Sequence, residues 1–182
     1  MAAFFDTTSL PKGLIDVFGR SRIPLTIADA GQDDHPLVGV NARFCDICGY
    51  TPQQVLGRNC RFLQPAAGVG PVRKRMNRFL TDDTQSDAKF VVPNVRSNGD
   101  PFINLVYMAK LAREGKVVAV LGSQFAVDGL ANDNAELYEQ ALNDDLTQLA
   151  TVLRTGKLAL LGSFEALANA HAIIARVRIE HG

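Results

Sequence analysis

Three strand-like segments separated by two short turns constrain the fold more than any other part of the sequence. The segments cover residues 89–95, 102–111 and 117–127, and the turns are Ser97-Asn98-Gly99-Asp100 and Arg113-Glu114-Gly115-Lys116. Asn-Gly favours a tight hairpin because both residues adopt the positive φ angles that such a turn requires. Short connections of this kind join antiparallel neighbours, so we predict an antiparallel sheet across this region.

Two further strands and several short helices are expected before this sheet. Residues 23–28 and 37–40 are rich in β-branched and other apolar residues, which is typical of strands. Asn41 can cap a helix that ends at Gly49, and Thr51-Pro52-Gln53-Gln54 starts another helix with a capping box, which ends at Gly57. Apolar residues at helical spacing predict a third helix over residues 72–80. The fold class is therefore α+β, with a sheet of about five strands and short helices on one face.

The chain divides into three parts on these patterns. We predict a helical N-terminal arm at 1–22, a sheet domain at 23–127, and a helical C-terminal extension at 128–182 that contains no strand. The extension should form a hairpin of two helices, with Ser163 capping the second and a leucine seam on the first, which consists of Leu142, Leu146, Leu149 and Leu153. Amphipathic helices of this kind bury little alone, so the pair should pack on the sheet or on another subunit. We expect a homodimer through these extensions.

Composition and charge exclude several classes of function. Lys plus Arg and Asp plus Glu both number 19, so the net charge is zero and a nucleic-acid partner is not expected. No run of about 18 apolar residues predicts a transmembrane helix, and the N-terminus lacks the features of a secretion signal. Three cysteines without an even pairing pattern fit a reducing compartment. We expect a cytoplasmic protein without a membrane partner.

Residues 57–64, Gly-Arg-Asn-Cys-Arg-Phe-Leu-Gln, have the composition of a chemical site. Cys60 lies between Asn59 and Arg61, and a reactive thiol needs polar or cationic neighbours of this kind. Burial as a small apolar side chain is the alternative for any free cysteine. Cys45 and Cys48 form a C-x-x-C inside a predicted helix. A structural zinc site needs about four ligands and no second pair exists, so we predict core or pocket packing and no metal site.

Polar side chains on the predicted strands point to a planar ligand. Asn94, Asn104 and Gln124 lie on neighbouring strands, where asparagine is depleted. Facing inward, three amides need hydrogen-bond partners, and a heterocycle with carbonyls and ring nitrogens would supply them; exposure on the outer face is the alternative. The next helix carries a basic cluster that is either solvated or binds a phosphate: Arg73, Lys74, Arg75 and Arg78.

With these residues assembled, the chain resembles a LOV domain, the flavin-binding blue-light branch of the PAS fold. Residues 57–64 match the family signature Gly-x-Asn-Cys-Arg-Phe-Leu-Gln throughout. Residues 94–105 resemble the family hairpin that carries two asparagines, and Gly122-Ser123-Gln124 resembles its Gly-Val-Gln. The resemblance covers residues 23–127, and it is to the short LOV type, which has no effector enzyme domain.

The resemblance implies FMN as the cofactor and Cys60 as the photoreactive thiol, which forms a reversible cysteinyl-flavin adduct at carbon 4a under blue light. Gln124 would face flavin nitrogen 5 and relay the signal. Arg61 would hold the phosphate. The remaining cofactor contacts would come from polar side chains along the site: Thr26, Asn59, Gln64, Asn94, Asn104 and Gln124. The second phosphate arginine of the family falls on Asn77, so Arg73 and Arg78 are candidates to replace it.

The function implied is a blue-light photoreceptor that is not itself an enzyme. Light would alter the packing of the helical extensions or dimerisation, and an unidentified downstream protein would receive the signal. Two alternatives remain open at this point. One is a flavin-based redox sensor that uses the three cysteines, and the other is a light-regulated transcription or protein-interaction regulator. The second alternative has little basic charge to bind DNA, because residues 163–178 contain only Arg176 and Arg178.

Overall fold

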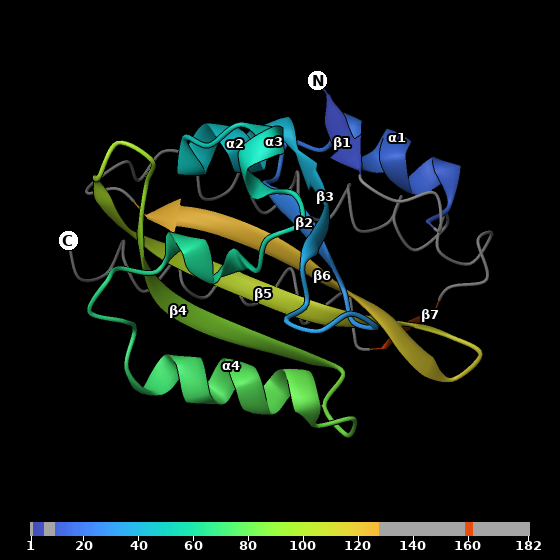
Figure 1. The fold of residues 1–182 in the computed structure, drawn as a ribbon. Coiled ribbons are helices and arrows are strands. Elements are labelled where there is room, and N and C mark those ends of the chain that lie inside the picture. Colours follow the sequence, from blue (N-terminus) through green and yellow to red (C-terminus); the bar gives the residue numbers. More distant parts are fainter. Residues whose placement is uncertain (1, 6–9, 128–158, 162–182) are drawn as a thin grey trace, which may run out of the picture.

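The computed structural model describes residues 2–5, 10–127 and 159–161. Its centre is an antiparallel sheet in the order β1-β3-β2-β6-β5-β4, with β7 paired to β5 (Figure 1). The predicted strands are all present: β2 (Leu25–Asp29), β3 (Leu37–Asn41), β4 (Asp87–Val95), β5 (Pro101–Arg113) and β6 (Lys116–Val127). The α+β class is therefore confirmed, and the expected strand number was too low because two short strands join the sheet from outside the predicted domain.

The first unexpected strand, β1 (Ala3–Phe5), lies in the arm that was predicted to be helical. It pairs with β3 in antiparallel register, with Phe5 opposite Gly39. A Cβ on Gly39 would lie 2.5 Å from the Phe5 ring, so glycine makes room for this strand. The helix of the arm is present as α1 (Lys12–Arg20). The helical description of 1–22 was thus correct for its second half only.

The second unexpected strand, β7 (Ala159–Leu161), contradicts the prediction that the C-terminal extension contains no strand. β4 begins opposite Ala109 of β5, so β4 leaves the edge of β5 uncovered beyond that point. β7 pairs with this edge, from Lys110 to Ala112. Three residues are too few to give a periodic signal, and tertiary pairing determines the strand. The leucine seam and the second predicted helix lie outside the described residues.

The helices of the central domain lie on one face of the sheet, as predicted. They are α2 (Ala42–Cys48), α3 (Pro52–Val55), the 3-10 helix η1 (Cys60–Leu63) and α4 (Pro71–Thr81), as seen in Figure 1. α1 packs on the opposite face, where Leu14, Val17 and Phe18 join one buried cluster with Leu25 and Ile27. Both faces of the sheet are therefore covered near β2. No helix among the described residues is long and apolar enough to cross a membrane.

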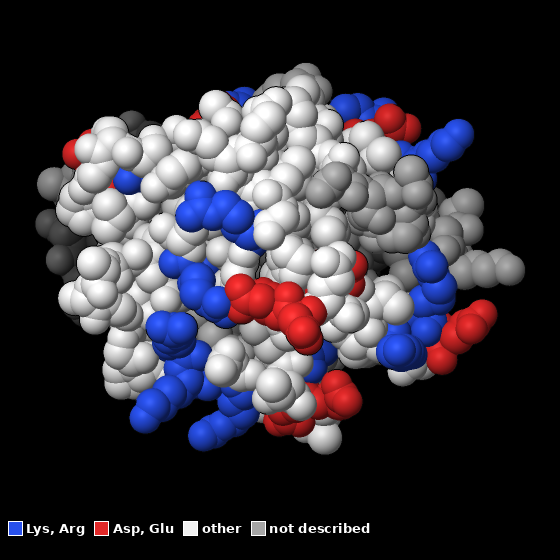
Figure 2. Space-filling view, viewed as in Figure 1, with Lys and Arg blue, Asp and Glu red and all other residues white. Residues whose placement is uncertain are grey.

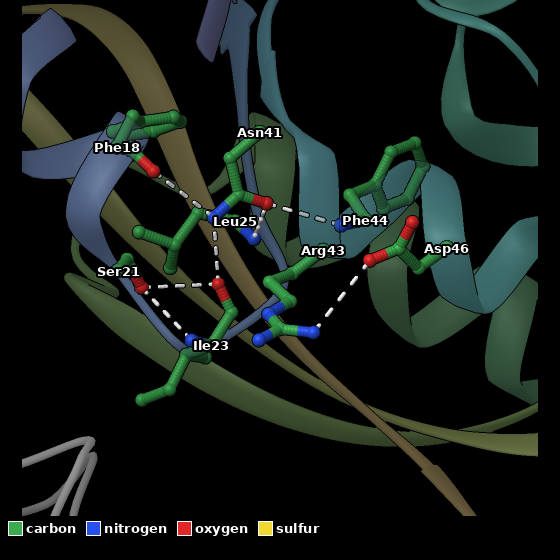
Figure 3. A network of polar contacts seen from close by, with 8 residues as sticks. All are labelled: Phe18, Ser21, Ile23, Leu25, Asn41, Arg43, Phe44 and Asp46. Atoms are coloured by element: carbon green, nitrogen blue, oxygen red, sulfur yellow. Dashed lines mark hydrogen bonds and ion pairs between the residues drawn. The ribbon is translucent and has the colours of Figure 1, made fainter. Parts of the chain in front are cut away.

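Asn41 ties three elements together at the start of α2 (Figure 3). Its Oδ1 accepts hydrogen bonds from the backbone N–H of Phe44 (3.0 Å) and of Leu25 (2.9 Å). Its Nδ2 donates to the backbone oxygens of Ile23 (2.7 Å) and Phe18 (3.3 Å). The predicted helix cap is confirmed, and the same side chain also fixes the end of α1 and the start of β2. This arrangement places α2 and the segment after it against the sheet.

Candidate functional site

A cavity of about 360 Å³ lies between the sheet and the helices η1 and α4. Its volume is within the range of small-molecule sites, roughly 300–1,000 Å³. The structure brings together in its lining all but one of the residues that sequence reasoning selected: Thr26, Asn59, Cys60, Arg61, Gln64, Arg73, Asn77, Asn94, Asn104 and Gln124. Residues from positions 26 to 124 thus converge on one space.

Arg78 is the selected residue that does not line the cavity. Arg73 and Asn77 are four residues apart on α4, and both line it. Each helical residue turns about 100° from the one before, so Arg78 points away from the face that Arg73 and Asn77 share. Its side chain is exposed. Of the candidates for a second phosphate contact, the structure therefore places Arg73 and Asn77 in the lining of the cavity and Arg78 outside it.

Cys60 is the first residue of η1, and its position follows from the local hydrogen bonding. The Asn59 side chain caps the turn by accepting a hydrogen bond from the backbone N–H of Arg61 at 2.9 Å. Burial raises the pKa of the Cys60 thiol to about 12; the neighbouring Cys48 adds to this effect, and a hydrogen bond with Gln124 opposes it. The thiol is therefore protonated at neutral pH, and it lies beside the amide of Gln124.

The other two cysteines behave as core residues. Cys48 is buried in an apolar cluster with Phe44, Val55 and Leu63, and Cys45 packs against the same cluster. Burial raises the pKa of Cys45 to about 11 and raises that of Cys48 as well. The core packing predicted for the C-x-x-C pair is confirmed. Neither thiol has the lowered pKa that disulfide exchange uses.

Three amides form a connected group on the cavity side of the sheet. Asn94, Asn104 and Gln124 are at most 4% exposed. The Nδ2 of Asn104 donates to the Oδ1 of Asn94 at 2.9 Å and to the Oε1 of Gln124 at 2.8 Å. The Oδ1 of Asn104 is buried and has no hydrogen-bond partner in the structure. A buried acceptor without a partner is costly, so this group is built to receive a donor from a bound molecule.

Thr26 and Gly122 face each other across β2 and β6 at the floor of the cavity. The Nε2 of Gln124 lies 3.5 Å from the Thr26 Oγ1. A Cβ on Gly122 would come within 2.5 Å of the same oxygen. Glycine at this position therefore keeps the floor flat beneath the three amides, which suits a planar ligand.

The mouth of the cavity carries charged groups on its rim. Figure 2 shows basic side chains gathered over α4 and beside η1, with acidic side chains next to them. Arg61 forms an ion pair with Asp34, and the Asn59 Nδ2 donates to the backbone oxygen of Asp34 at 2.5 Å. Asp34 and His35 also line the cavity. An anionic group would meet Arg61 and Arg73 here.

Sequence reasoning missed two kinds of lining residue. The first kind is the apolar wall, which consists of Ala28, Leu37, Leu63, Met76, Leu80, Val92, Val106, Met108 and Val120. Alternate residues of a strand face the same side of the sheet. The strand residues Val92, Val106, Met108 and Val120 lie two or four positions from one of the three amides, so they could have been identified from the sequence. The second kind is Asp34 with His35, which lie in a turn between β2 and β3. No local pattern distinguishes these turn residues from any other polar turn.

Comparison with known proteins agrees with this geometry. A profile described as "PAS domain" matches residues 28–125. The d2 variant of RsLOV is 30% identical with a TM-score of 0.75, and the match covers 94% of this chain and 97% of that one. The Rhodobacter sphaeroides LOV protein is 28% identical with a TM-score of 0.73 over the same shares.

Curated relatives match over the sheet domain. The blue light receptor lreA of Aspergillus flavus is 39% identical over 93 residues, which are 45% of this chain and 11% of that protein. A blue-light-activated histidine kinase of Rhizobium johnstonii is 31% identical over 108 residues, which are 59% of this chain and 31% of that protein. The matched region thus spans less than a third of the length of these two relatives. The chain belongs to the PAS domain family and, within it, to the LOV branch.

Proposed function

We propose that this chain is a blue-light receptor that binds FMN in the cavity and uses Cys60 as its photoreactive thiol, whose sulfur bonds reversibly to flavin carbon 4a. One observation carries the proposal: Cys60 and Gln124 lie together in a cavity whose floor holds a buried group of three amides. The comparisons support it, because one relative that matches this domain is named a blue light receptor and another a blue-light-activated histidine kinase.

The residues present fit a flavin. The Asn104 Oδ1, which is buried without a partner, would accept a hydrogen bond from the N–H of the ring edge. Val92, Val106 and Leu80 supply apolar walls, and Arg61 and Arg73 stand at the mouth, where a phosphate would emerge. A solved structure described as "Flavin Analogue Sheds Light on Light-Oxygen-Voltage Domain Mechanism" is 29% identical with a TM-score of 0.54, which supports a flavin in this fold.

The flavin supplies light absorption and an electrophilic ring carbon, and the chain supplies the thiol, its proton and the amide beside it. Because the pKa of Cys60 is about 12, its sulfur holds a proton in the dark at neutral pH. Formation of a carbon–sulfur bond requires that proton to leave the sulfur, and flavin nitrogen 5, which Gln124 would face, would take it up. Gln124 is suited to sense this event, because its amide can either donate or accept a hydrogen bond. A changed partner would require the amide to rotate or to lose its bond to Asn104.

An absorption spectrum of the purified full chain tests the proposal. We expect a flavin band that bleaches under blue light and recovers in darkness. A Cys60→Ala variant should bind flavin but lose this bleaching, because alanine has no sulfur, whereas Cys45→Ala should bleach as the natural chain does. Bleaching and recovery of the same form in Cys60→Ala would overturn the role given to the thiol, and a colourless protein that binds no added flavin would overturn the whole proposal.

The output we propose is a change in association without enzymatic activity of the chain itself. Light would alter how α1 and the C-terminal extension pack, within a homodimer or against an unidentified signalling protein. The observed link is β7, which pairs the extension to β5 between Lys110 and Ala112. The redox-sensor alternative loses support because burial raises the pKa of all three cysteines.

A further inference from the structure

The mouth of the cavity contains a carboxylate beside the arginine that is proposed to hold the flavin phosphate. The Arg61 Nη2 donates a hydrogen bond to the Asp34 Oδ1. Among the described residues that line the cavity, only Arg61 and Arg73 carry a permanent positive charge, and only Asp34 carries a negative one. The rim therefore offers a net charge of one positive unit to a phosphate that carries about two negative ones at neutral pH.

The turn that carries Asp34 is held in place rather than free to swing away. The backbone oxygen of Asp34 accepts a hydrogen bond from the Asn59 Nδ2, and Asn59 also caps η1. Asp34 and His35 have φ angles of 68° and 47°, in the left-handed region, which residues other than glycine adopt rarely. The same asparagine thus fixes both the helix of Arg61 and the turn of Asp34, so the two charges remain neighbours.

The pair is weak enough to be displaced by a ligand. The side chain of Arg61 is 43% exposed and that of Asp34 is 53% exposed. Ion pairs exposed to this extent contribute little because water screens them. A phosphate can therefore bind the guanidinium, but only after it displaces the carboxylate from it. The bound phosphate then remains close to the displaced carboxylate.

We propose that Asp34 is a specificity-determining residue of the flavin site. Its carboxylate competes with the phosphate for the Arg61 guanidinium and thereby weakens FMN binding. Riboflavin, the flavin that lacks a phosphate, is unaffected, so the ratio of FMN affinity to riboflavin affinity is lowered. The inference rests on the proposed flavin-binding function. It explains why an arginine at the mouth is paired with an acid instead of being left free for the phosphate.

The test is the dissociation constant of each flavin for the flavin-stripped full chain, followed in the dark by quenching of flavin fluorescence. Asp34→Asn removes the charge and keeps a residue type that tolerates a positive φ. We expect it to tighten FMN binding roughly threefold to fivefold, the equivalent of a surface ion pair, and to leave riboflavin binding within about twofold. In an Arg61→Gln background, Asp34→Asn should tighten FMN binding less than it does in the natural chain, because the contested guanidinium is gone and only repulsion between the carboxylate and the phosphate remains.

Asp33→Asn is the matched control, because it makes the same charge change one residue away and Asp33 does not line the cavity. An unchanged ratio of FMN to riboflavin affinity in Asp34→Asn would refute the inference, and so would an equal gain in Asp33→Asn. Weaker FMN binding in Asp34→Asn would show that the carboxylate positions Arg61 instead, which also refutes it. If the natural chain binds neither flavin, the proposed function fails as well, so the two failures are distinguishable.

Discussion

Cys60 shows how the surroundings of one residue determine its chemistry. The octapeptide suggests a thiol made reactive by neighbouring arginines, but in the folded chain burial raises the pKa of the thiol, and the neighbouring Cys48 adds to this effect. A thiolate nucleophile is therefore not the resting form. This environment suits a thiol that stays protonated until the proposed flavin beside it is excited. It does not suit thiol–disulfide exchange, which uses a thiolate.

The raised pKa predicts a pH dependence of stability. A cysteine whose pKa rises from 9.0 unfolded to about 12 folded binds its proton more tightly in the folded state. Its contribution is complete below the unfolded pKa and is lost as the pH rises through the folded one. The free energy of unfolding in the dark should therefore fall between about pH 9 and pH 12, and it should fall less steeply in Cys60→Ala. Urea denaturation at several pH values measures both slopes; equal slopes would contradict the assignment.

The three amides and the rim arginines were predictable from the sequence, but the acid on the rim was not. Asn94, Asn104 and Gln124 stand out because amides are rare in strands, and the hairpin turn fixes which residues can meet. Asp34 carries no such signal, because acids are common in turns. The position of Arg78 outside the lining was unpredictable for a similar reason: a cluster of cations does not show which side of the helix faces the cavity until the helix is placed on the sheet.

At the level of elements, the β4–β5 hairpin is hydrogen-bonded to the C-terminal end of α2. The backbone N–H of Ser97 donates to the Cys48 oxygen at 2.9 Å, and the Ser97 hydroxyl donates to the Gly49 oxygen at 2.7 Å. The Arg96 guanidinium reaches the Ile47 oxygen as well. Since β4 and β5 carry Asn94 and Asn104, the strands that hold the amides are joined directly to the helix that holds Cys48. A rearrangement of the amides can thus reach α2 through a few backbone contacts.

Asn41 gives a prediction about how the elements are held together. Its four hydrogen bonds join α1, β2 and α2, and it is 1% exposed. Asn41→Ala leaves buried backbone groups unpaired, and it should lower the free energy of unfolding by about 3 kcal/mol. Asn98→Ala is the control, because Asn98 is exposed in the hairpin turn, and it should cost less than about 1 kcal/mol. Urea titrations followed by circular dichroism give both values; equal losses would contradict the tethering role.

The elements that the sequence did not predict are those defined by partners far along the chain. The cap at Asn41 and the helix end at Gly49 were predictable because capping is local, and both are confirmed. β1 and β7 are each three residues long and exist because β3 and β5 offer uncovered edges. Lys110 is a related case: it lies in a strand pattern, yet it is 1% exposed, and its Nζ donates to the Asp82 oxygen at 2.7 Å. Only the folded chain shows that this lysine caps the C-terminal end of α4.

On the scale of the whole molecule, the cavity and the extension are physically connected. Gln124 lies on β6, which pairs with β5 along most of its length, and β5 carries β7 on its other edge. Lys110 lies opposite Val120 on one side and Leu161 on the other. A change at Gln124 is therefore separated from the C-terminal extension by a single strand. This short route makes the extension a physically reasonable receiver of the signal.

The leucine seam of the extension provides the test of this route. It lies outside the described residues, so the prediction rests on its sequence: Leu142, Leu146, Leu149 and Leu153 recur at the spacing of a helix that needs an apolar partner. Leu146→Glu combined with Leu149→Glu should abolish any difference in elution volume between dark and illuminated protein, because charges on the seam prevent its burial. Bleaching should remain, since the cavity-lining residues that the structure describes all lie between Thr26 and Gln124. Gln148→Glu, off the seam, should retain the response. A natural chain that elutes as one unchanged monomer in darkness and light would show that association is not the output, and the packing of the extension within one chain would then have to carry the signal.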